Sequence, residues 1–213
     1  MGEGGATGAI EGSDGGSGAR EPGGGGAGEA GAAPTGGLVD GCADLDTDGI
    51  ADCDVTLVET PSFTSDVNGW TPLEDAELTW DAKNALGDLP SGSARLIAAT
   101  PRASAAQCVD LAGEQLVIAY AQAFVKPEPG AEDPPRALLE ISFFEADACD
   151  GERSRYFATP PSAATDEWVT IQAGGLATDA TRSLSIALVA TKAQSAADVT
   201  VYFDNVMLKV QPL

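Results

Sequence analysis

The stretch that decides the fold is ALLEISFFEAD, residues 137–147. Within it Leu139, Ile141 and Phe143 occupy every second position, and polar residues stand between them. Successive side chains of a β-strand point to opposite faces, so this period of two residues is that of a half-buried strand. The stretch therefore predicts a strand with one face on a hydrophobic core and the other in water.

The same alternation recurs later, in RSLSIALVAT (182–191) and VTVYFDNVMLKV (199–210). Clusters of Gly, Pro, Asp and Ser separate short apolar segments from one another, and no long segment has a helical stripe. We therefore predict an all-β fold, a two-sheet β-sandwich, over residues 55–213. The predicted strands are 55–59, 68–71, 77–81, 93–99, 106–111, 115–126, 136–146, 153–158, 168–173, 182–192 and 199–210.

The N-terminal part has a different composition. Residues 1–37 hold 16 of the 26 glycines and no aromatic residue. Such a segment buries too little apolar surface to offset the entropy of ordering its backbone. We predict that residues 1–39 are a disordered Gly-rich tether and that an acidic junction, 40–54, joins it to the β domain.

The charge and composition exclude several classes of function. A net charge of -22, from 33 acidic and 11 basic residues, argues against nucleic acid and anionic membrane surfaces as partners. Histidine is absent, which removes Ser-His-Asp and Cys-His catalysis and the usual zinc ligands. No apolar run approaches the length of a membrane helix, so we expect no membrane insertion by this chain.

The four cysteines indicate an oxidising compartment. An even number without a C-x-x-C motif suggests two disulfides, for which the sequence allows three pairings. We favour Cys42–Cys53, across the acidic junction, and Cys108–Cys149, between two predicted strands. We therefore expect an extracellular or cell-envelope surface location, with any export signal trimmed because the N-terminus lacks a basic region and an apolar core.

The acidic junction contains DLDTDGIADCD, residues 44–54. Its first nine positions match an EF-hand calcium loop, but position 12 is a valine where a glutamate is needed. The spacing resembles a single thrombospondin type 3 repeat, which implies a structural calcium ion. The alternative is an acidic linker that binds no metal. The candidate calcium ligands are Asp44, Asp46, Asp48, Ile50 and Asp52.

Seven segments of the β domain occur in a characteristic order: LVETPSFTSDVNGW, SGSARLIA, QCVDL, YAQAFVK, ALLEISFFEADACDG, EWVTIQAG and VYFDNVML. In this order and spacing the domain resembles the β-jelly-roll carbohydrate-binding modules of the family 4, 9 and 22 type and their galactose-binding-like relatives. The resemblance implies a jelly roll that is non-catalytic and binds a polysaccharide or other glycan on a concave sheet face or at strand-edge loops.

The resemblance also implies particular residues. Asp204 matches an aspartate that holds a structural calcium, although the position of the other usual acidic ligand is Thr64, for which Glu59 is a substitute. Cysteines at the positions of Cys108 and Cys149 are frequent in such proteins.

Aromatic rings and amides are the groups that bind sugars, because rings stack on apolar C–H faces and amides bond the hydroxyls. Trp80, Tyr120, Gln122 and Tyr156 are the predicted glycan-binding residues. For each aromatic the alternative role is packing between the sheets.

Two other functions remain open. The first is a surface structural or adhesion protein that has the jelly roll and binds no sugar, which the aromatic content of 6% favours. The second is a hydrolase that uses carboxylates such as Glu140, Glu145 and Asp147. Glu140 and Glu145 are five positions apart, which sends them to opposite faces of an ideal strand. The leading prediction is a non-catalytic module, of unspecified oligomeric state.

Overall fold

A computed structural model describes residues 56–213 except 88–90, 112, 127–133, 163 and 195–196. The tether, the acidic junction with its five candidate calcium ligands, and Cys42 and Cys53 lie outside the described residues. Within the described part no helix is long and apolar enough to cross a membrane.

The described residues form ten β-strands and one short 3-10 turn, with no α-helix among them. The elements in chain order are β1 (Thr71–Leu73), β2 (Glu77–Asp81), β3 (Ser93–Ala98), β4 (Arg102–Asp110), β5 (Gln115–Val125), β6 (Arg136–Phe144), η2 (Asp147–Cys149), β7 (Arg153–Ala158), β8 (Trp168–Leu176), β9 (Ser183–Thr191) and β10 (Val199–Pro212).

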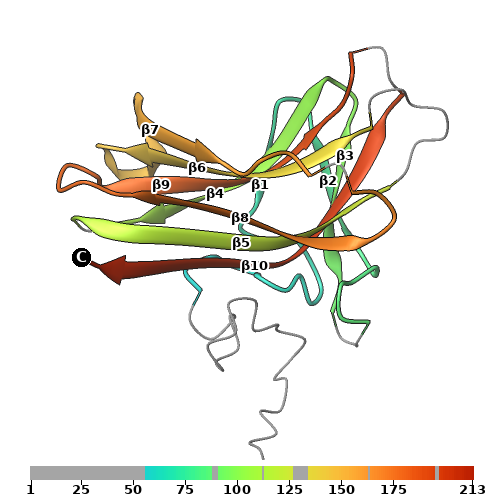
Figure 1. Ribbon diagram of the computed structural model, residues 1–213, viewed down its shortest axis with the longest axis horizontal. Helices are drawn as coiled ribbons and strands as arrows, with labels where there is room; N and C mark the ends of the chain where they lie inside the picture. Colours follow the sequence, from blue (N-terminus) through green and yellow to red (C-terminus); the bar gives the residue numbers. More distant parts are fainter. Residues whose placement is uncertain (1–55, 88–90, 112, 127–133, 163, 195–196) are drawn as a thin grey trace, which may run out of the picture. The chain divides into compact units, whose positions relative to one another are not determined.

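The strands make two five-stranded sheets that face each other, as Figure 1 shows. Sheet A has the order β1-β4-β9-β6-β7, and sheet B has the order β2-β3-β10-β5-β8. All paired strands within the two sheets are antiparallel. The predicted all-β sandwich is therefore confirmed.

The core lies between the sheets and follows the predicted alternation. Leu139, Ile141 and Phe143 of β6 are fully buried, and they stand in register with apolar positions of β9. Sheet B contributes a row of small side chains from β5, and Val201 and Phe203 from β10. The alternating residues of each strand consequently point away from the core and form the two outer faces of the sandwich.

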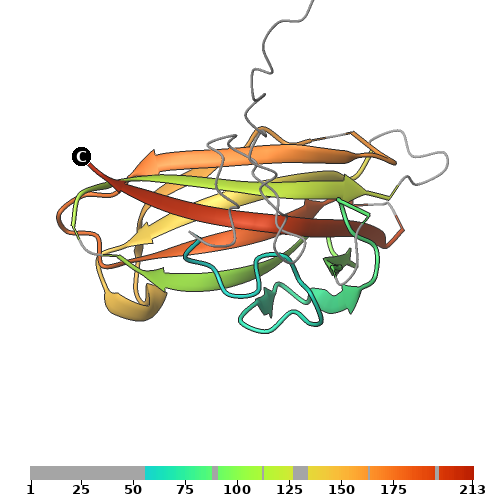
Figure 2. The ribbon, with the colours of Figure 1, turned by 90° about the horizontal axis from the view of Figure 1, so that it is seen from below.

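The start of the domain differs from the prediction, because residues 56–59 do not form a strand. Instead the segment 56–63 follows the edge of β10, where Leu57 N donates to Leu208 O (3.0 Å) and Val206 N donates to Pro61 O (2.8 Å) (Figure 2). Positive φ at Thr60 and Phe63 bends this segment out of a regular ladder.

The predicted strand 68–71 is likewise shorter, since β1 begins only at Thr71. A turn over Asn68 and Gly69 precedes it, and Gly69 has a φ of +83°, which glycine adopts readily.

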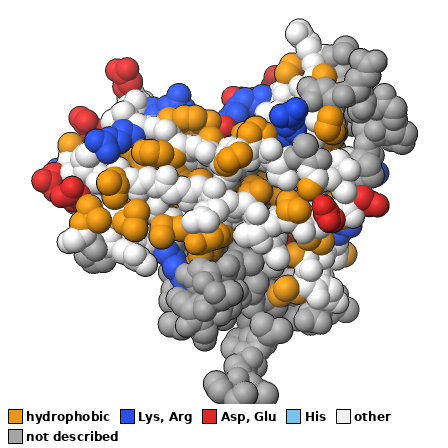
Figure 3. Space-filling view, viewed as in Figure 1, with side chains coloured by type: hydrophobic (Ala, Val, Ile, Leu, Met, Phe, Trp, Pro, Cys, Tyr) orange, Lys and Arg blue, Asp and Glu red, His pale blue; other side chains and the backbone are white. Residues whose placement is uncertain are grey.

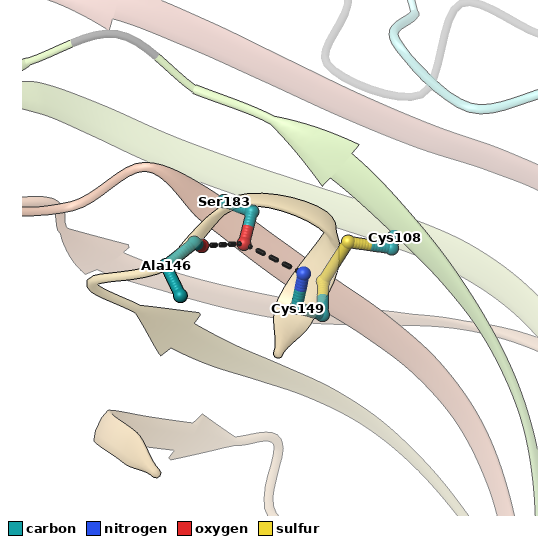
Figure 4. Close-up of a disulfide and its surroundings, with 4 residues drawn as sticks. All are labelled: Cys108, Ala146, Cys149 and Ser183. Carbon is teal, nitrogen blue, oxygen red and sulfur yellow. Dashed lines mark hydrogen bonds between the residues drawn. A yellow bond between two sulfur atoms is a disulfide. The ribbon is translucent and has the colours of Figure 1, made fainter. Parts of the chain in front are cut away.

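A disulfide ties sheet A together at one end (Figure 4). Cys108 of β4 bonds Cys149 of η2, which confirms one of the two predicted pairings. Ser183, at the start of β9, accepts a hydrogen bond from Cys149 N (2.9 Å) and donates one to Ala146 O (2.6 Å). The turn after β6 is thus fixed to both β4 and β9.

Replacing both cysteines (Cys108→Ala with Cys149→Ala) should lower the free energy of unfolding by about 4 kcal/mol, the chain-entropy value for a sequence separation of 41 residues. Urea unfolding followed by tryptophan fluorescence measures this loss. The double variant is preferable to a reducing agent because a reductant would also act on the predicted Cys42–Cys53 disulfide. A loss below about 1 kcal/mol would contradict the expected contribution of the Cys108–Cys149 disulfide.

Candidate functional site

The outer face of sheet A carries a polar network over a floor of small residues. On the central strand β9, the outward-facing residues Ser185 and Ala187 are small. Ala187 stands in register with Glu140 of β6 on one side and with Ala106 of β4 on the other. Arg102 of β4 stands in register with Thr191, so its side chain reaches Glu140 diagonally past Val189, which is fully buried.

Arg102 of β4 forms the centre of this network. Its Nη1 and Nη2 atoms donate to Oε1 and Oε2 of Glu140, at 2.9 and 2.8 Å. Its Nε lies 2.9 Å from Oε2 of Glu74, which follows β1, and Ser104 Oγ donates to the same oxygen at 3.1 Å. A two-pronged pair of this kind fixes both side chains, since the planar guanidinium matches the carboxylate.

Tyr156 and Arg153 extend the network onto β7. Tyr156 stands in register with Ser142 of β6, two positions from Glu140 on the same face. The Arg153 guanidinium lies 4.6 Å from the centroid of the Tyr156 ring. Tyr156 is 44% exposed. The network thus runs from the end of β1 to β7 and ends in an aromatic side chain that solvent can reach.

The charges of this network are stable near neutral pH. Burial by itself would raise the pKa of Glu140, but hydrogen bonds from Arg102 and Tyr156 outweigh it and hold that pKa below its usual value. Burial and the hydrogen bond to Glu140 raise the pKa of Tyr156 to about 12. The hydrogen bond to Glu140 also raises the pKa of Arg102. Glu140 is therefore an ionised carboxylate, and Tyr156 is a neutral hydroxyl.

In the space-filling view, Lys and Arg side chains gather along the upper outline, where sheet A is the upper layer (Figure 3). Hydrophobic side chains and a few Asp and Glu side chains stand among the basic ones.

The structure separates the four predicted glycan-binding residues. Tyr156 lies on the outer face of sheet A, whereas Tyr120 and Gln122 lie on the outer face of sheet B. Gln122 Oε1 accepts a hydrogen bond from Asn205 Nδ2 at 2.7 Å. Trp80 lies on edge strand β2.

Trp80 is 40% exposed but is anchored, because its Nε1 donates to Phe63 O at 2.7 Å. A Cβ atom at Gly92 would lie 2.4 Å from that nitrogen, so the ring also depends on this glycine. The indole connects β2 to the segment before β1.

An aromatic cluster occupies one end of the outer face of sheet B. Phe124 packs against Trp168 and Tyr202, with ring centroids 5.6 and 6.0 Å apart. Lys83 covers it, with Nζ 3.5 Å from the Phe124 centroid. The ring face of Phe124 is thus occupied by a residue of the chain itself.

Asp204 is fully buried next to a β-bulge, where the register of β10 shifts and Asn205 takes a φ of +48°. Its Oδ2 accepts a hydrogen bond from Ala85 N (2.9 Å) and its Oδ1 accepts one from Asn205 N (2.7 Å). Burial raises the pKa of Asp204 to about 7.

These contacts bear on the calcium ion expected at Asp204. Calcium requires six to eight oxygen ligands, and the described residues contain no group of three or more acidic or cysteine side chains that could hold a metal. The backbone of Glu59 is hydrogen-bonded to the side chain of Gln107. Calcium at Asp204 stays a prediction, and we base no step on a metal there.

Sequence reasoning missed three members of the network: Glu74, Arg102 and Arg153. Arg102 and Glu140 are 38 positions apart and lie on strands that are not neighbours in the sheet. The alternation of β6 does point Glu140 outward, but its partner becomes visible only once the strand order is known.

The comparisons with known proteins concern the fold. No protein-family model matches the sequence, and no curated protein matches it. Among solved structures, the family 16 carbohydrate-binding module-2 is similar with a TM-score of 0.51 and 19% identity, over 71% of this chain and 98% of that one. The CBM22-1-GH10 modules of Clostridium thermocellum xylanase 10B, complexed with xylohexaose, give a TM-score of 0.52 and 19% identity, over 75% of this chain and 29% of that one.

A third similar structure is the enzymatically active domain of tailspike protein 4 of bacteriophage CBA120, with a TM-score of 0.54 and 12% identity, over 74% of this chain. This chain spans only 22% of that domain. At such identities the similarity shows the fold alone. The class that the fold defines is the β-jelly-roll sandwich found in carbohydrate-binding modules, which confirms the resemblance to those modules at the level of fold.

The two carboxylates that contact Arg102 should differ in their effect on stability. Glu140→Gln should lower the free energy of unfolding by roughly 1–2 kcal/mol, because the Glu140 side chain is 7% exposed and its charge-assisted hydrogen bonds are lost. Glu74→Gln should change it by less than about 1 kcal/mol, because that pair is exposed. Urea unfolding of the two matched variants tests this. Equal losses of unfolding free energy in the two variants would contradict a larger contribution from the Arg102–Glu140 pair.

Asp204 should make stability depend on pH. Its pKa of about 7 in the folded chain exceeds the ordinary value of 3.8, so the folded state holds a proton that the unfolded state has lost. The free energy of unfolding should therefore fall by roughly 2–3 kcal/mol as the pH rises from 5 to 8.

The measurement is urea unfolding at several pH values with a chelator present. Asp204→Asn should remove this part of the pH dependence, whereas Asp198→Asn, at an exposed carboxylate, should retain it. Parallel curves for the wild-type chain and Asp204→Asn would contradict the prediction.

Proposed function

We propose that the chain is a non-catalytic glycan-binding module and that the glycan binds on the outer face of sheet A. The observation that carries this proposal is the network of Arg102, Glu140 and Tyr156, in which a half-exposed arginine pairs with a buried carboxylate beside an exposed tyrosine. The fold, which is shared with carbohydrate-binding modules, supports the same function.

The groups on this face suit a sugar. A pyranose presents apolar C–H groups on its faces and hydroxyls around its rim. Tyr156 offers a ring that can contact the apolar C–H groups. Ser142 and Ser185 face outward in register with each other, and their hydroxyls can bond the hydroxyls of the sugar. Ala106 and Ala187 leave space for the sugar ring between them and the network.

The same network argues against hydrolysis. Glycoside hydrolysis needs a protonated carboxylic acid beside a second carboxylate. Glu140 is held ionised by Arg102, and Glu145 and Asp147 lie exposed after the end of β6. The proposed module therefore binds its glycan without cleaving it.

The wider setting is part of the proposal. We expect the module to act outside the cell or on its envelope, where the Cys108–Cys149 disulfide is stable, at the end of a flexible tether. Calcium bound by the acidic junction would stiffen the link between tether and domain.

A polysaccharide panel tests the function. The full chain, with calcium present, is tested by affinity electrophoresis in soluble polysaccharides and by pulldown on insoluble ones. Tyr156→Ala should weaken binding at least about tenfold, the loss of one aromatic contact. Tyr120→Ala, on the outer face of sheet B, is the matched control and should stay within about twofold.

Two results would contradict the proposal. If Tyr120→Ala abolishes binding and Tyr156→Ala does not, the site lies on sheet B. If the folded chain binds no polysaccharide, the alternative of a surface structural or adhesion protein is favoured.

A further inference from the structure

Three of the chain's eleven basic residues lie on the proposed binding face. Arg102, Arg136 and Arg153 all occupy outward-facing positions of sheet A, although the chain has three acidic residues for each basic one. The two acidic members of the network, Glu74 and Glu140, both contact Arg102. The carboxylates of Glu74 and Glu140 are thus directed at Arg102 and not at Arg153.

A β-bulge directs Arg153 to this face. The register between β6 and β7 shifts between Phe143 and Phe144, so that Arg153 stands opposite Phe144 and Tyr156 stands opposite Ser142. In an unbroken strand, residues three positions apart point to opposite faces. The bulge thus brings both side chains to the outer face, and bulges commonly re-aim a side chain in this way.

The Arg153 guanidinium is oriented by a ring contact. The ring of Tyr156 supports it at 4.6 Å, and the charge of Arg153 helps to hold the pKa of Glu140 below its usual value. Arg153 makes no ion pair within 4.0 Å in the described part of the chain. A stacked guanidinium presents its N–H donors at its edge, and a planar carboxylate is the group that accepts two of them.

We propose that Arg153 and Tyr156 form a subsite for a uronic-acid residue, so that the glycan bound by this module is an acidic polysaccharide. The proposal rests on the glycan-binding function proposed above and adds the class of ligand. Arg153 donates to the sugar carboxylate, and the exposed part of the Tyr156 ring contacts the apolar C–H groups of the same residue. Arg102 stays engaged with Glu140 and keeps the tyrosine in place.

The experiment compares each acidic polysaccharide with its own carboxyl-reduced form, which has the same backbone and linkages but no charge. The probes are oligosaccharides of polygalacturonate, alginate and glucuronoxylan, titrated by calorimetry into the full chain. We expect at least one acidic probe to bind about tenfold to a hundredfold more tightly than its reduced form, the range of a charge-assisted hydrogen bond. Binding of that probe should weaken as NaCl is raised from 50 to 500 mM.

Three variants test whether Arg153 causes the preference for the acidic probe. Arg153→Ala should remove the preference, so that the acidic probe and its reduced form bind this variant within about twofold of each other. Arg153→Lys keeps the charge but not the planar fork, and should restore part of the preference. Arg95→Ala removes an arginine from the outer face of sheet B and is the control for net charge, so it should keep the preference.

Each other outcome is decisive. Equal binding of both forms, or tight binding of sulfated glycans alone, would overturn the uronic-acid subsite and leave the glycan-binding function standing. A preference that survives Arg153→Ala would overturn the role of Arg153. No binding to any glycan by the folded chain would overturn both proposals.

Discussion

The shared core between the two sheets is the constraint on which the rest of this structure depends. Leu139, Ile141 and Phe143 can be buried only if the strand period sends the residues between them outward, and this places Glu140 on the outer face of sheet A. The same rule places Tyr120 on the outer face of sheet B. The core thereby decides which polar and aromatic side chains can reach a ligand and on which side of the sandwich they do so.

Much of the fold follows from local sequence. The period of two residues predicted the strands 136–146, 182–192 and 199–210 and their buried faces, because burial on one side acts on each strand separately. The predicted disulfide between Cys108 and Cys149 is present, and it joins the end of β4 to the turn that follows β6. The first segment failed because its backbone bends at positions of positive φ, which a pattern of apolar residues does not encode.

The site was harder to predict because its residues come together only through the order of the strands in sheet A. Tyr120 and Tyr156 are both aromatic residues on outward faces, yet their strands belong to different sheets. Arg102 meets Glu140 because β9 alone separates β4 from β6 in the sheet. Arg153 reaches the same face only because of a register shift in β7. Such contacts join positions far apart in the sequence and depend on the pairing of whole strands.

The central claim is that the outer face of sheet A binds the glycan, and NMR titration of the ¹⁵N-labelled full chain with an oligosaccharide that it binds tests this most directly. The account predicts that the amide shifts that change most belong to β4, β6, β7 and β9, around Ala106, Glu140, Tyr156 and Ala187. Changes confined to β5, β8 and β10, around Tyr120 and Gln122, would contradict it and would place the site on the opposite face.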